Sequence, residues 1–562
     1  VTITVGEYEI SFSKVIAQMK KGLYEIDLPN GEIFVFPDEW IQLGESLSKA
    51  KHKSNTFSVK KYQVDILGLI KSKEIKAHLN SLVKIRKEKP CPTFNGTLRP
   101  YQIDGLSWLM FLFNNRFGGI LADDMGLGKT VQTLAFLQLV KQRIKKENSS
   151  VKFLLIAPTS LLYNWSHEAQ EFSPDLKCHI HSGTKRQKSA DKLEKFDLII
   201  TSYGLIRNDS ELFQSLDFDV TILDESQNIK NHSTKTTQYI NKIESRCRVA
   251  LTGTPIENSI RDLWSQMNFL NKGLLGSLKD FDEKYARPIE KGQDEKKAEE
   301  LRKKIKPFLL RRTKSEVATE LPPITEKIIY CEMTERQAEI YEETKSKYRN
   351  NILEVIEEKG LQKSKFNILQ GLSKLRQLAN HPKLVDSEYS DASGKHEILL
   401  EKIRNAISDG HKVLIFSQFV SYLDIIQRDL EKLHVNLFKL TGSTSKEKRA
   451  TYVSEFQKTT IPSAFLISLK AGGTGLNLTS ADYVFIVDPW WNPAAEAQAR
   501  DRTHRIGQIQ NVFSYKFITR ESIEEKIISL QQKKKGYSKD IIMSENNILK
   551  NLDTNELEFL FA

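Results

Sequence analysis

Two series of short apolar segments, each alternating with longer helical patterns, constrain the fold of this chain more than any other feature. The first series has F-L-L-I-A at Phe153, D-L-I-I-T at Asp197, V-T-I-L-D at Val220 and V-A-L-T at Val249. The second has V-L-I-F-S at Val413, L-F-K-L-T at Leu437, A-F-L-I-S at Ala464, Y-V-F-I-V at Tyr483 and F-S-Y-K-F at Phe513. Strand-length apolar runs that alternate with helices are typical of βαβ units with buried parallel strands. The sequence therefore predicts an α/β fold with two parallel sheets in two lobes.

The chain length agrees with several domains rather than one, because 562 residues at roughly 100 to 200 per domain give about three or four. The stretch 256–395 separates the two series with a mostly helical, heavily charged pattern. Near the N-terminus, two alternating runs joined through Pro29, Asn30 and Gly31 predict a β-hairpin. We expect an N-terminal accessory segment with this hairpin (1–90), a first lobe (91–255), helical protrusions with an inter-lobe linker (256–395), a second lobe (396–525) and a C-terminal segment (526–562).

Composition and cysteine usage exclude several classes of protein. Lysine and arginine number 84 against 72 aspartates and glutamates, a net charge of +12 that permits polyanion partners without requiring them. The longest apolar stretches fall far short of the roughly 20 residues that cross a bilayer, so we expect no membrane partner. The N-terminus V-T-I-T-V-G lacks a signal-peptide pattern, and neither a disulfide framework nor a zinc cluster is expected from four widely separated cysteines: Cys91, Cys178, Cys247 and Cys331.

The segment L-A-D-D-M-G-L-G-K-T, from Leu121 to Thr130, resembles a phosphate-binding P-loop between an apolar segment and a helical pattern. Gly126 and Gly128 would let backbone N–H groups curl around phosphate oxygens. Lys129 would neutralise the β and γ phosphates, and Thr130 would bind Mg²⁺ at the start of the helix. Asp123 replaces the first glycine of the strict pattern, so a simple glycine-rich turn is the alternative.

The segment V-T-I-L-D-E-S-Q, from Val220 to Gln227, places two adjacent carboxylates at the end of a predicted strand. In an ATPase, Asp224 would hold Mg²⁺ and Glu225 would orient or deprotonate the attacking water. The alternative is that the pair only caps the next helix. The preceding apolar strand and the upstream P-loop favour the ATPase interpretation.

The segment Q-A-R-D-R-T-H-R-I-G-Q, from Gln498, places Arg500, Arg502 and Arg505 on or near one helical segment of the second lobe. The second lobe could present these arginines to a nucleotide held by the first lobe. They would then stabilise charge that develops on the γ-phosphate. The alternatives are a basic surface helix and a helix that makes polar contacts between domains.

Read in order, the motifs of this chain resemble those of the Swi/Snf family of ATP-dependent DNA translocases, which belongs to helicase superfamily two. They are L-R-P-Y-Q at Leu98, D-D-M-G-L-G-K-T at Asp123, A-P-T-S-L-L-Y-N-W at Ala157, I-T-S-Y at Ile200, D-E-S-Q at Asp224, L-T-G-T-P at Leu251, P-F-L-L-R-R-T-K at Pro307, L-R-Q-L-A-N-H-P at Leu375, L-K-A-G-G-T-G-L-N-L at Leu469, D-P-W-W-N-P at Asp488 and D-R-T-H-R-I-G-Q at Asp501. The resemblance implies two RecA-like lobes with helical protrusions, a small N-terminal domain, a cleft for Mg-ATP, and a C-terminal brace.

The resemblance also implies roles for individual residues. Gln102 matches the adenine-reading glutamine, because an amide can bond the adenine edge in both directions. Gln227 stands where related helicases often carry histidine, and either side chain can hydrogen-bond between the lobes. The implied catalytic residues are Lys129, Asp224, Glu225, Gln498, Arg502 and Arg505. The implied ATP-binding residues are Gln102, Asp124, Met125, Gly126, Leu127, Gly128, Lys129, Thr130, Gly475 and Asn477, with Thr130 and Asp224 as Mg²⁺ ligands.

Nucleic-acid contacts are implied at loops on the same edge of both sheets, where small residues and hydroxyls suit sequence-independent contacts to phosphate and sugar. In the first lobe they are Pro158, Thr159, Ser160, Thr201, Ser202 and Tyr203. In the second lobe they are Ser417, Gln418, Gly442, Ser443, Lys470, Ala471, Gly472, Gly473 and Thr474. Trp490 and Trp491 would either stack on a base or pack a loop beside Pro489 and Pro493.

Together these features predict a DNA-stimulated ATP hydrolase that translocates along double-stranded DNA and remodels or displaces bound proteins. ATP binding would close the cleft, hydrolysis would reopen it, and alternating grip on one strand would produce steps. One alternative is a helicase that separates strands of DNA or RNA. Another is an ATP-gated module that acts on a protein partner such as RNA polymerase. We expect a monomer, in a prokaryotic cytoplasm with the nucleoid or in a nucleus if the source is eukaryotic.

Overall fold

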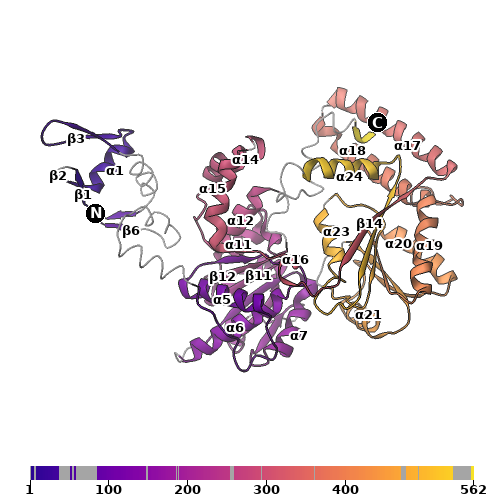
Figure 1. The fold of residues 1–562 in the computed structure, drawn as a ribbon, viewed down its shortest axis with the longest axis horizontal. Coiled ribbons are helices and arrows are strands. Elements are labelled where there is room, and N and C mark those ends of the chain that lie inside the picture. Colours follow the sequence, from indigo (N-terminus) through magenta and orange to yellow (C-terminus); the bar gives the residue numbers. More distant parts are fainter. Residues whose placement is uncertain are drawn as a thin grey trace.

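The computed structural model describes residues 2–5, 8–36, 51–53, 56–58, 85–146, 150–184, 186–187, 189–253, 259–292, 294–359, 361–469, 476–491, 493–535 and 559–561. Two α/β lobes lie side by side in Figure 1, with α5 to α12 in the first lobe and α19 to α23 in the second. Helices α14 (Arg287–Gly292) and α15 (Glu295–Ile305) extend from the first lobe, and α17 (Glu335–Lys359) and α18 (Leu361–Asn380) from the second. The predicted α/β fold with two parallel-sheet lobes is confirmed.

The sheet of the first lobe has seven strands in the order β13-β7-β12-β11-β8-β10-β9, and neighbouring strands are parallel. The strands are β7 (Gly119–Leu121), β8 (Phe153–Ala157), β9 (Cys178–His181), β10 (Leu198–Ser202), β11 (Phe218–Asp224), β12 (Ser245–Leu251) and β13 (Leu309–Leu310). Helices α5 (Pro100–Asn115), α6 (Lys129–Lys146), α7 (Leu162–Phe172), α11 (Lys235–Lys242) and α12 (Ile260–Leu270) accompany it. The predicted strands at Phe153, Asp197, Val220 and Val249 are confirmed as β8, β10, β11 and β12.

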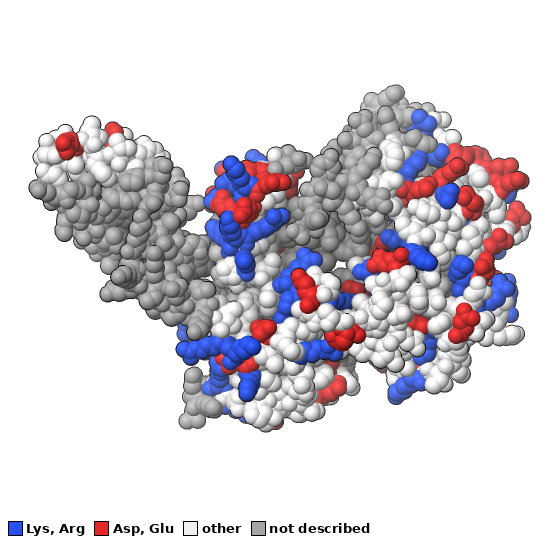
Figure 2. Space-filling view, in the orientation of Figure 1, with Lys and Arg blue, Asp and Glu red and all other residues white. Residues whose placement is uncertain are grey.

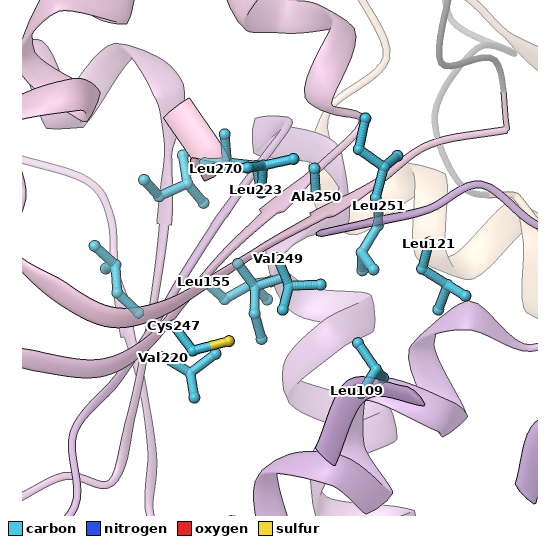
Figure 3. Packing of buried hydrophobic residues seen from close by; sticks show 14 of the residues in the cluster. Leu109, Leu121, Leu155, Val220, Leu223, Cys247, Val249, Ala250, Leu251 and Leu270 are labelled. Carbon is cyan, nitrogen blue, oxygen red and sulfur yellow. The ribbon is translucent and has the colours of Figure 1, made fainter. Parts of the chain in front are cut away.

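The core of the first lobe explains why its central strands are apolar along their whole length. Cys247 and Val249 point to one side of the sheet, and Leu223 and Ala250 point to the other (Figure 3). All four are almost completely buried. Alternation between apolar and polar residues would expose one face, whereas helices cover both faces of a parallel sheet.

The sheet of the second lobe has six parallel strands in the order β14-β19-β18-β15-β17-β16. They are β14 (Ile324–Cys331), β15 (Val413–Ser417), β16 (Asn436–Leu440), β17 (Ser463–Ser468), β18 (Tyr483–Ile486) and β19 (Val512–Thr519). Helices α19 (Gly394–Ser408), α20 (Val420–Lys432), α21 (Lys446–Lys458) and α23 (Pro493–Arg500) belong to this lobe. The five strands predicted from Val413 onward are confirmed, and β14 is an addition.

The predicted lobe bounds, 91–255 and 396–525, leave out one strand of each sheet. The segment 256–395 is largely helical as expected, but β13 joins the first sheet and β14 joins the second. Strand β14 pairs with β19 from Ile324↔Val512 to Cys331↔Thr519, at the edge of its sheet. Because it is an edge strand with several exposed residues, its sequence I-T-E-K-I-I-Y-C lacks the continuous apolar run of a buried strand.

The N-terminal region contains the predicted hairpin, and the C-terminal region adds a helix to the second lobe. Strands β3 (Glu25–Asp27) and β4 (Ile33–Val35) pair antiparallel, so the predicted hairpin is confirmed. Helix α24 (Ile523–Lys535) packs on α18 in the predicted brace region. Among the described residues, no helix has the length and apolarity needed to cross a membrane.

Candidate active site

The P-loop lies between β7 and the first turn of α6, as the sequence predicts. Gly126 and Gly128 have φ values of +88° and +77°, a left-handed conformation that favours glycine. Lys129 folds back over the loop, and its Nζ donates to the carbonyl of Asp123 at 2.5 Å. Burial lowers the pKa of Lys129, while the nearby carboxylates of Glu225, Asp123 and Asp224 act in the opposite direction. The loop therefore presents a buried ammonium to a ligand beside it.

The departure from the strict P-loop pattern at Asp123 has a structural partner in Arg312. The carboxylate of Asp123 is fully buried and accepts from Arg312 Nε at 2.9 Å and from Arg312 Nη2 at 2.5 Å. Gln132 Nε2 also donates to it at 3.2 Å. Arg312 follows β13, the strand that pairs with β7. A two-point guanidinium–carboxylate contact thus anchors the start of the P-loop, a role that sequence reasoning did not assign.

Gln102 lies against the P-loop, but its amide is engaged by the protein. Its Oε1 accepts from the backbone N–H of Arg99 at 2.9 Å, and its Nε2 donates to the carbonyl of Leu127 at 3.1 Å. The hydroxyl of Tyr101 donates to the same carbonyl at 2.9 Å. These contacts tie helix α5 to the loop, and adenine reading by Gln102 remains a prediction.

The two carboxylates of D-E-S-Q lie where β11 ends. Asp224 Oδ1 accepts from the backbone N–H of Glu225 at 2.9 Å, and Asp224 Oδ2 accepts from the indole N–H of Trp165 at 2.7 Å. Glu225 has a φ of +50°, which is uncommon for a residue with a side chain. Gln227 Nε2 donates to Glu225 Oε2 at 2.8 Å. Gln227 therefore contacts the first lobe itself, where it also accepts from Thr252.

The electrostatics of this group suit a cation. Burial raises the pKa of Asp224, and the neighbouring Glu225 carboxylate raises it further. Burial likewise raises the pKa of Glu168 to about 7, against the effect of Arg505 and of a hydrogen bond with Thr130. Neighbouring carboxylates repel one another when they are ionised, and a divalent cation bound among them offsets this repulsion. Asp224 and the hydroxyl of Thr130 are thus chemically suited to hold Mg²⁺, a cation that prefers oxygen ligands.

The second lobe brings Arg502 and Arg505 to this group. A Cβ atom built on Gly126 would lie 2.7 Å from Cγ of Arg505, so Arg505 packs directly on the P-loop. Burial lowers the pKa of Arg502 to about 9, with a further lowering from Arg505 and an opposing effect of Glu225. Arg502 is fully buried, and none of its three guanidinium nitrogens has a hydrogen-bond partner among the described residues. Unpaired buried donors in the segment that also packs Arg505 on the P-loop fit a polyphosphate ligand.

Lys314 bridges the two halves of the site. Its backbone N–H donates to Asp124 Oδ2 at 3.1 Å in the P-loop. Its ammonium donates to Asp501 Oδ1 at 2.8 Å and to the carbonyl of His504, in the segment that carries Arg502 and Arg505. Burial lowers the pKa of Lys314, and Asp501 opposes that shift. One side chain thus links the P-loop to the arginine segment, and sequence reasoning missed it.

The remaining predicted ATP-binding residues differ in their placement. Met125 packs near Gly253 of L-T-G-T-P, and Leu127 is buried beside Tyr101. Asn477 is exposed, and Gln498 is half-buried on α23. Gly475 lies outside the described residues, so its predicted contact with nucleotide stays a prediction.

The predicted nucleic-acid contacts divide into exposed and buried sets. Thr159, Gly442 and Ser443 are exposed and follow β8 and β16, while Pro158, Ser160, Gln418 and Trp490 are partly buried. The side chains of four further residues are buried: Thr201, Ser202, Tyr203 and Ser417. Lys470, Ala471, Gly472, Gly473 and Thr474 lie outside the described residues.

The buried set corrects the sequence interpretation. Tyr203 donates its hydroxyl to the carbonyl of Asp224 at 2.7 Å, Thr201 donates to the carbonyl of His181, and Ser417 donates to Asp488. The structure therefore does not present these three hydroxyls to a surface ligand, because each already has a hydrogen-bond acceptor within the protein. Trp491 is also buried, in a cluster with Tyr341, and so packs a loop.

Charge on the surface does not single out a binding face. On the side shown in Figure 2, basic and acidic side chains are interspersed over both lobes. Non-specific nucleic-acid binding depends strongly on contacts between cations and phosphates. On this side, no broad basic patch marks a nucleic-acid interface, so the exposed loops are the candidates for one.

Two family matches cover most of the chain. Residues 101–384 match the family described as SNF2-related domain, and residues 394–507 match the helicase conserved C-terminal domain. The first match alone spans half of the chain.

Relatives of this chain include proteins from a bacterium, a yeast and an archaeon. A Bacillus subtilis protein described as "Putative ATP-dependent helicase/translocase YwqA" is 42% identical over 505 residues, covering 87% of this chain and 54% of that protein. The TATA-binding protein-associated factor MOT1 of Saccharomyces cerevisiae is 35% identical, covering 83% of this chain and 28% of that protein. A solved structure titled "Sulfolobus solfataricus SWI2/SNF2 ATPase core in complex with dsDNA" is 40% identical, covering 84% of this chain and 99% of that one, with a TM-score of 0.42. The chain thus spans about half or less of the curated relatives named here.

Proposed function

The chain belongs to the SNF2 family, and from this premise we propose that it is an ATP hydrolase that translocates along double-stranded DNA. One observation carries the hydrolase proposal. Arg505 of the second lobe packs on the P-loop of the first lobe, and Arg502 and Arg505 both interact electrostatically with the Glu225 carboxylate. A nucleotide between the P-loop and these arginines would contact both lobes at once.

Each group has a role that its chemistry allows. Lys129 contacts the β and γ phosphates, and Gly126 and Gly128 leave room for phosphate oxygens. Thr130 and Asp224 hold Mg²⁺, which neutralises charge on the phosphates when bound. Glu225, held by Gln227, orients the attacking water and accepts its proton.

The arginines act on the charge that develops during hydrolysis. Arg502 and Arg505 donate to the γ-phosphate as it leaves, where their charge stabilises the transition state. Arg502 is fully buried and Arg505 is half-buried, so little water screens their charge. Gln498, Gly475 and Asn477 complete the second-lobe side of the nucleotide site, and Gln102 reads adenine after exchanging its present partners.

The DNA part of the proposal draws on the exposed loops and on the names of relatives. Thr159, Gly442 and Ser443 follow strands of the two sheets and can contact phosphates without reading bases. Opening and closing of the ATP site then moves the DNA contacts of one lobe relative to those of the other. The chain steps in this way, as a monomer, along one strand of a duplex. The load it displaces is a DNA-bound protein.

Steady-state ATP hydrolysis with different nucleic acids tests this proposal. Turnover is measured without nucleic acid and with single-stranded DNA, duplex DNA of increasing length and duplex RNA, with Glu225→Gln as the inactive control. Stimulation by duplex DNA that rises with length and then levels off supports translocation, because only a tracking motor meets the ends. Equal stimulation by single strands or RNA would instead support a strand-separating helicase, and indifference to all nucleic acids would support a module that acts on a protein partner.

A further inference from the structure

Helix α7 (Leu162–Phe172) presents Trp165 to the proposed Mg²⁺ site, and the functional proposal does not use this side chain. Trp165 and Glu168 are three residues apart, so they lie on one face of the helix. Trp165 is 3% exposed, and Glu168 is half-buried. His167, between them, is exposed and faces away. The inner face of α7 thus contacts the site, and its outer face contacts solvent.

Trp165 fixes the carboxylate of Asp224. Its indole N–H donates to Asp224 Oδ2 at 2.7 Å, while the backbone N–H of Glu225 donates to Asp224 Oδ1 at 2.9 Å. An indole nitrogen only donates, so it holds a carboxylate without competing for a cation. With one donor on each oxygen, the rotation of the Asp224 carboxylate is set before any metal binds.

We propose that Trp165 is a positioning residue for the metal site, acting through the carboxylate of Asp224. The inference rests on the proposed ATPase function and deepens it. Outer-shell groups of this kind typically change metal affinity or activity by about 10- to 100-fold when removed. A merely structural role would instead change stability and nucleotide binding without regard to the metal.

The test is a Mg²⁺ titration of ADP binding in the absence of DNA. Binding of fluorescently labelled ADP to the full chain is measured at increasing Mg²⁺ for wild type and Trp165→Phe. His167→Gln is the matched control on the outer face of the same helix. Phenylalanine keeps an aromatic ring at position 165 but removes the indole donor. Thermal unfolding is recorded for each variant.

We expect Trp165→Phe to raise the Mg²⁺ concentration at half-saturation about tenfold or more. ADP binding of Trp165→Phe without Mg²⁺ should stay within about twofold of wild type, and His167→Gln should match wild type throughout. An unchanged Mg²⁺ dependence in Trp165→Phe, or an equal loss of ADP binding with and without Mg²⁺, would overturn the inference. Failure of the proposed function looks different: wild type would bind Mg-ADP yet show no ATP turnover with any nucleic acid.

Discussion

Replacement of Arg502 by methionine should make the protein more stable and inactive at the same time. The guanidinium is fully buried, and its three nitrogens have no hydrogen-bond partner among the described residues. Arg505 adds like-charge repulsion. When the chain folds without nucleotide, the Arg502 guanidinium therefore loses its hydrogen bonds to water and gains few hydrogen bonds to the protein. A residue with such an environment is explained by a ligand rather than by the fold.

The size of both effects follows from these contacts. Replacing a buried charge by an apolar side chain of similar volume is often neutral or stabilising by about 1–4 kcal/mol. At about 2–4 °C per kcal/mol for a unit of roughly 150–250 residues, a gain of 2 kcal/mol raises the Tm by about 4–8 °C. Loss of an arginine that stabilises the γ-phosphate lowers kcat by about 10³-fold or more.

The assay pairs thermal unfolding without nucleotide with ATP turnover, and Arg500→Met serves as control. Arg500 lies in the same segment but forms an ion pair with Glu326 and is partly exposed. A pair of that kind contributes about 0–1 kcal/mol, so the control should change Tm little and keep its activity. A lower Tm in Arg502→Met would refute the reasoning, because it would show that Arg502 has stabilising partners in the fold. Near-normal kcat would refute the arginine's role in hydrolysis.

Three further predictions concern the contacts around the site and the stability of the first lobe. Asp123→Gly restores the strict P-loop pattern but should lower the free energy of unfolding in urea by about 3–5 kcal/mol, because Arg312 loses its buried carboxylate partner. The double variant Asp123→Gly, Arg312→Met should recover part of that loss. Lys314→Met removes the bridge to Asp501 and should lower ATP turnover about tenfold, which corresponds to about 1.4 kcal/mol of transition-state stabilisation. The exposed control Lys279→Met should retain wild-type turnover. Equal turnover of Lys314→Met and wild type would show that the bridge does not align the arginines. Hydrogen bonding from Arg186 lowers the pKa of Asp209 to about 2, so the stability it contributes is present above about pH 4 and is lost as the pH falls toward 2. The stability difference between wild type and Asp209→Asn should therefore shrink over that range, and a constant difference would contradict the assignment.

Local pattern in the sequence was enough for the strands and for the chemistry of single segments. Strands β8, β11 and β15 are buried on both faces, so each reads as an apolar run with no help from its neighbours. The P-loop and D-E-S-Q are also local, since each is one turn at the end of one strand. The same holds for the N-terminal hairpin, where Asn30 and Gly31 mark the turn.

Tertiary structure decided which distant segments meet. The sequence of β14 contains several polar residues, because an edge strand is not covered on its open side. Its partner β19 lies near the other end of the second lobe's sequence. Arg312 and Lys314 reach the P-loop only because β13 pairs with β7, and Trp165 reaches Asp224 only because β8 and β11 are neighbours. Burial of Thr201, Ser202, Tyr203 and Ser417 could not be anticipated either, since a hydroxyl at a strand end can face solvent or a neighbouring strand. A sequence shows periodicity over a few residues, whereas contacts between distant segments depend on sheet order and packing, which no short pattern encodes.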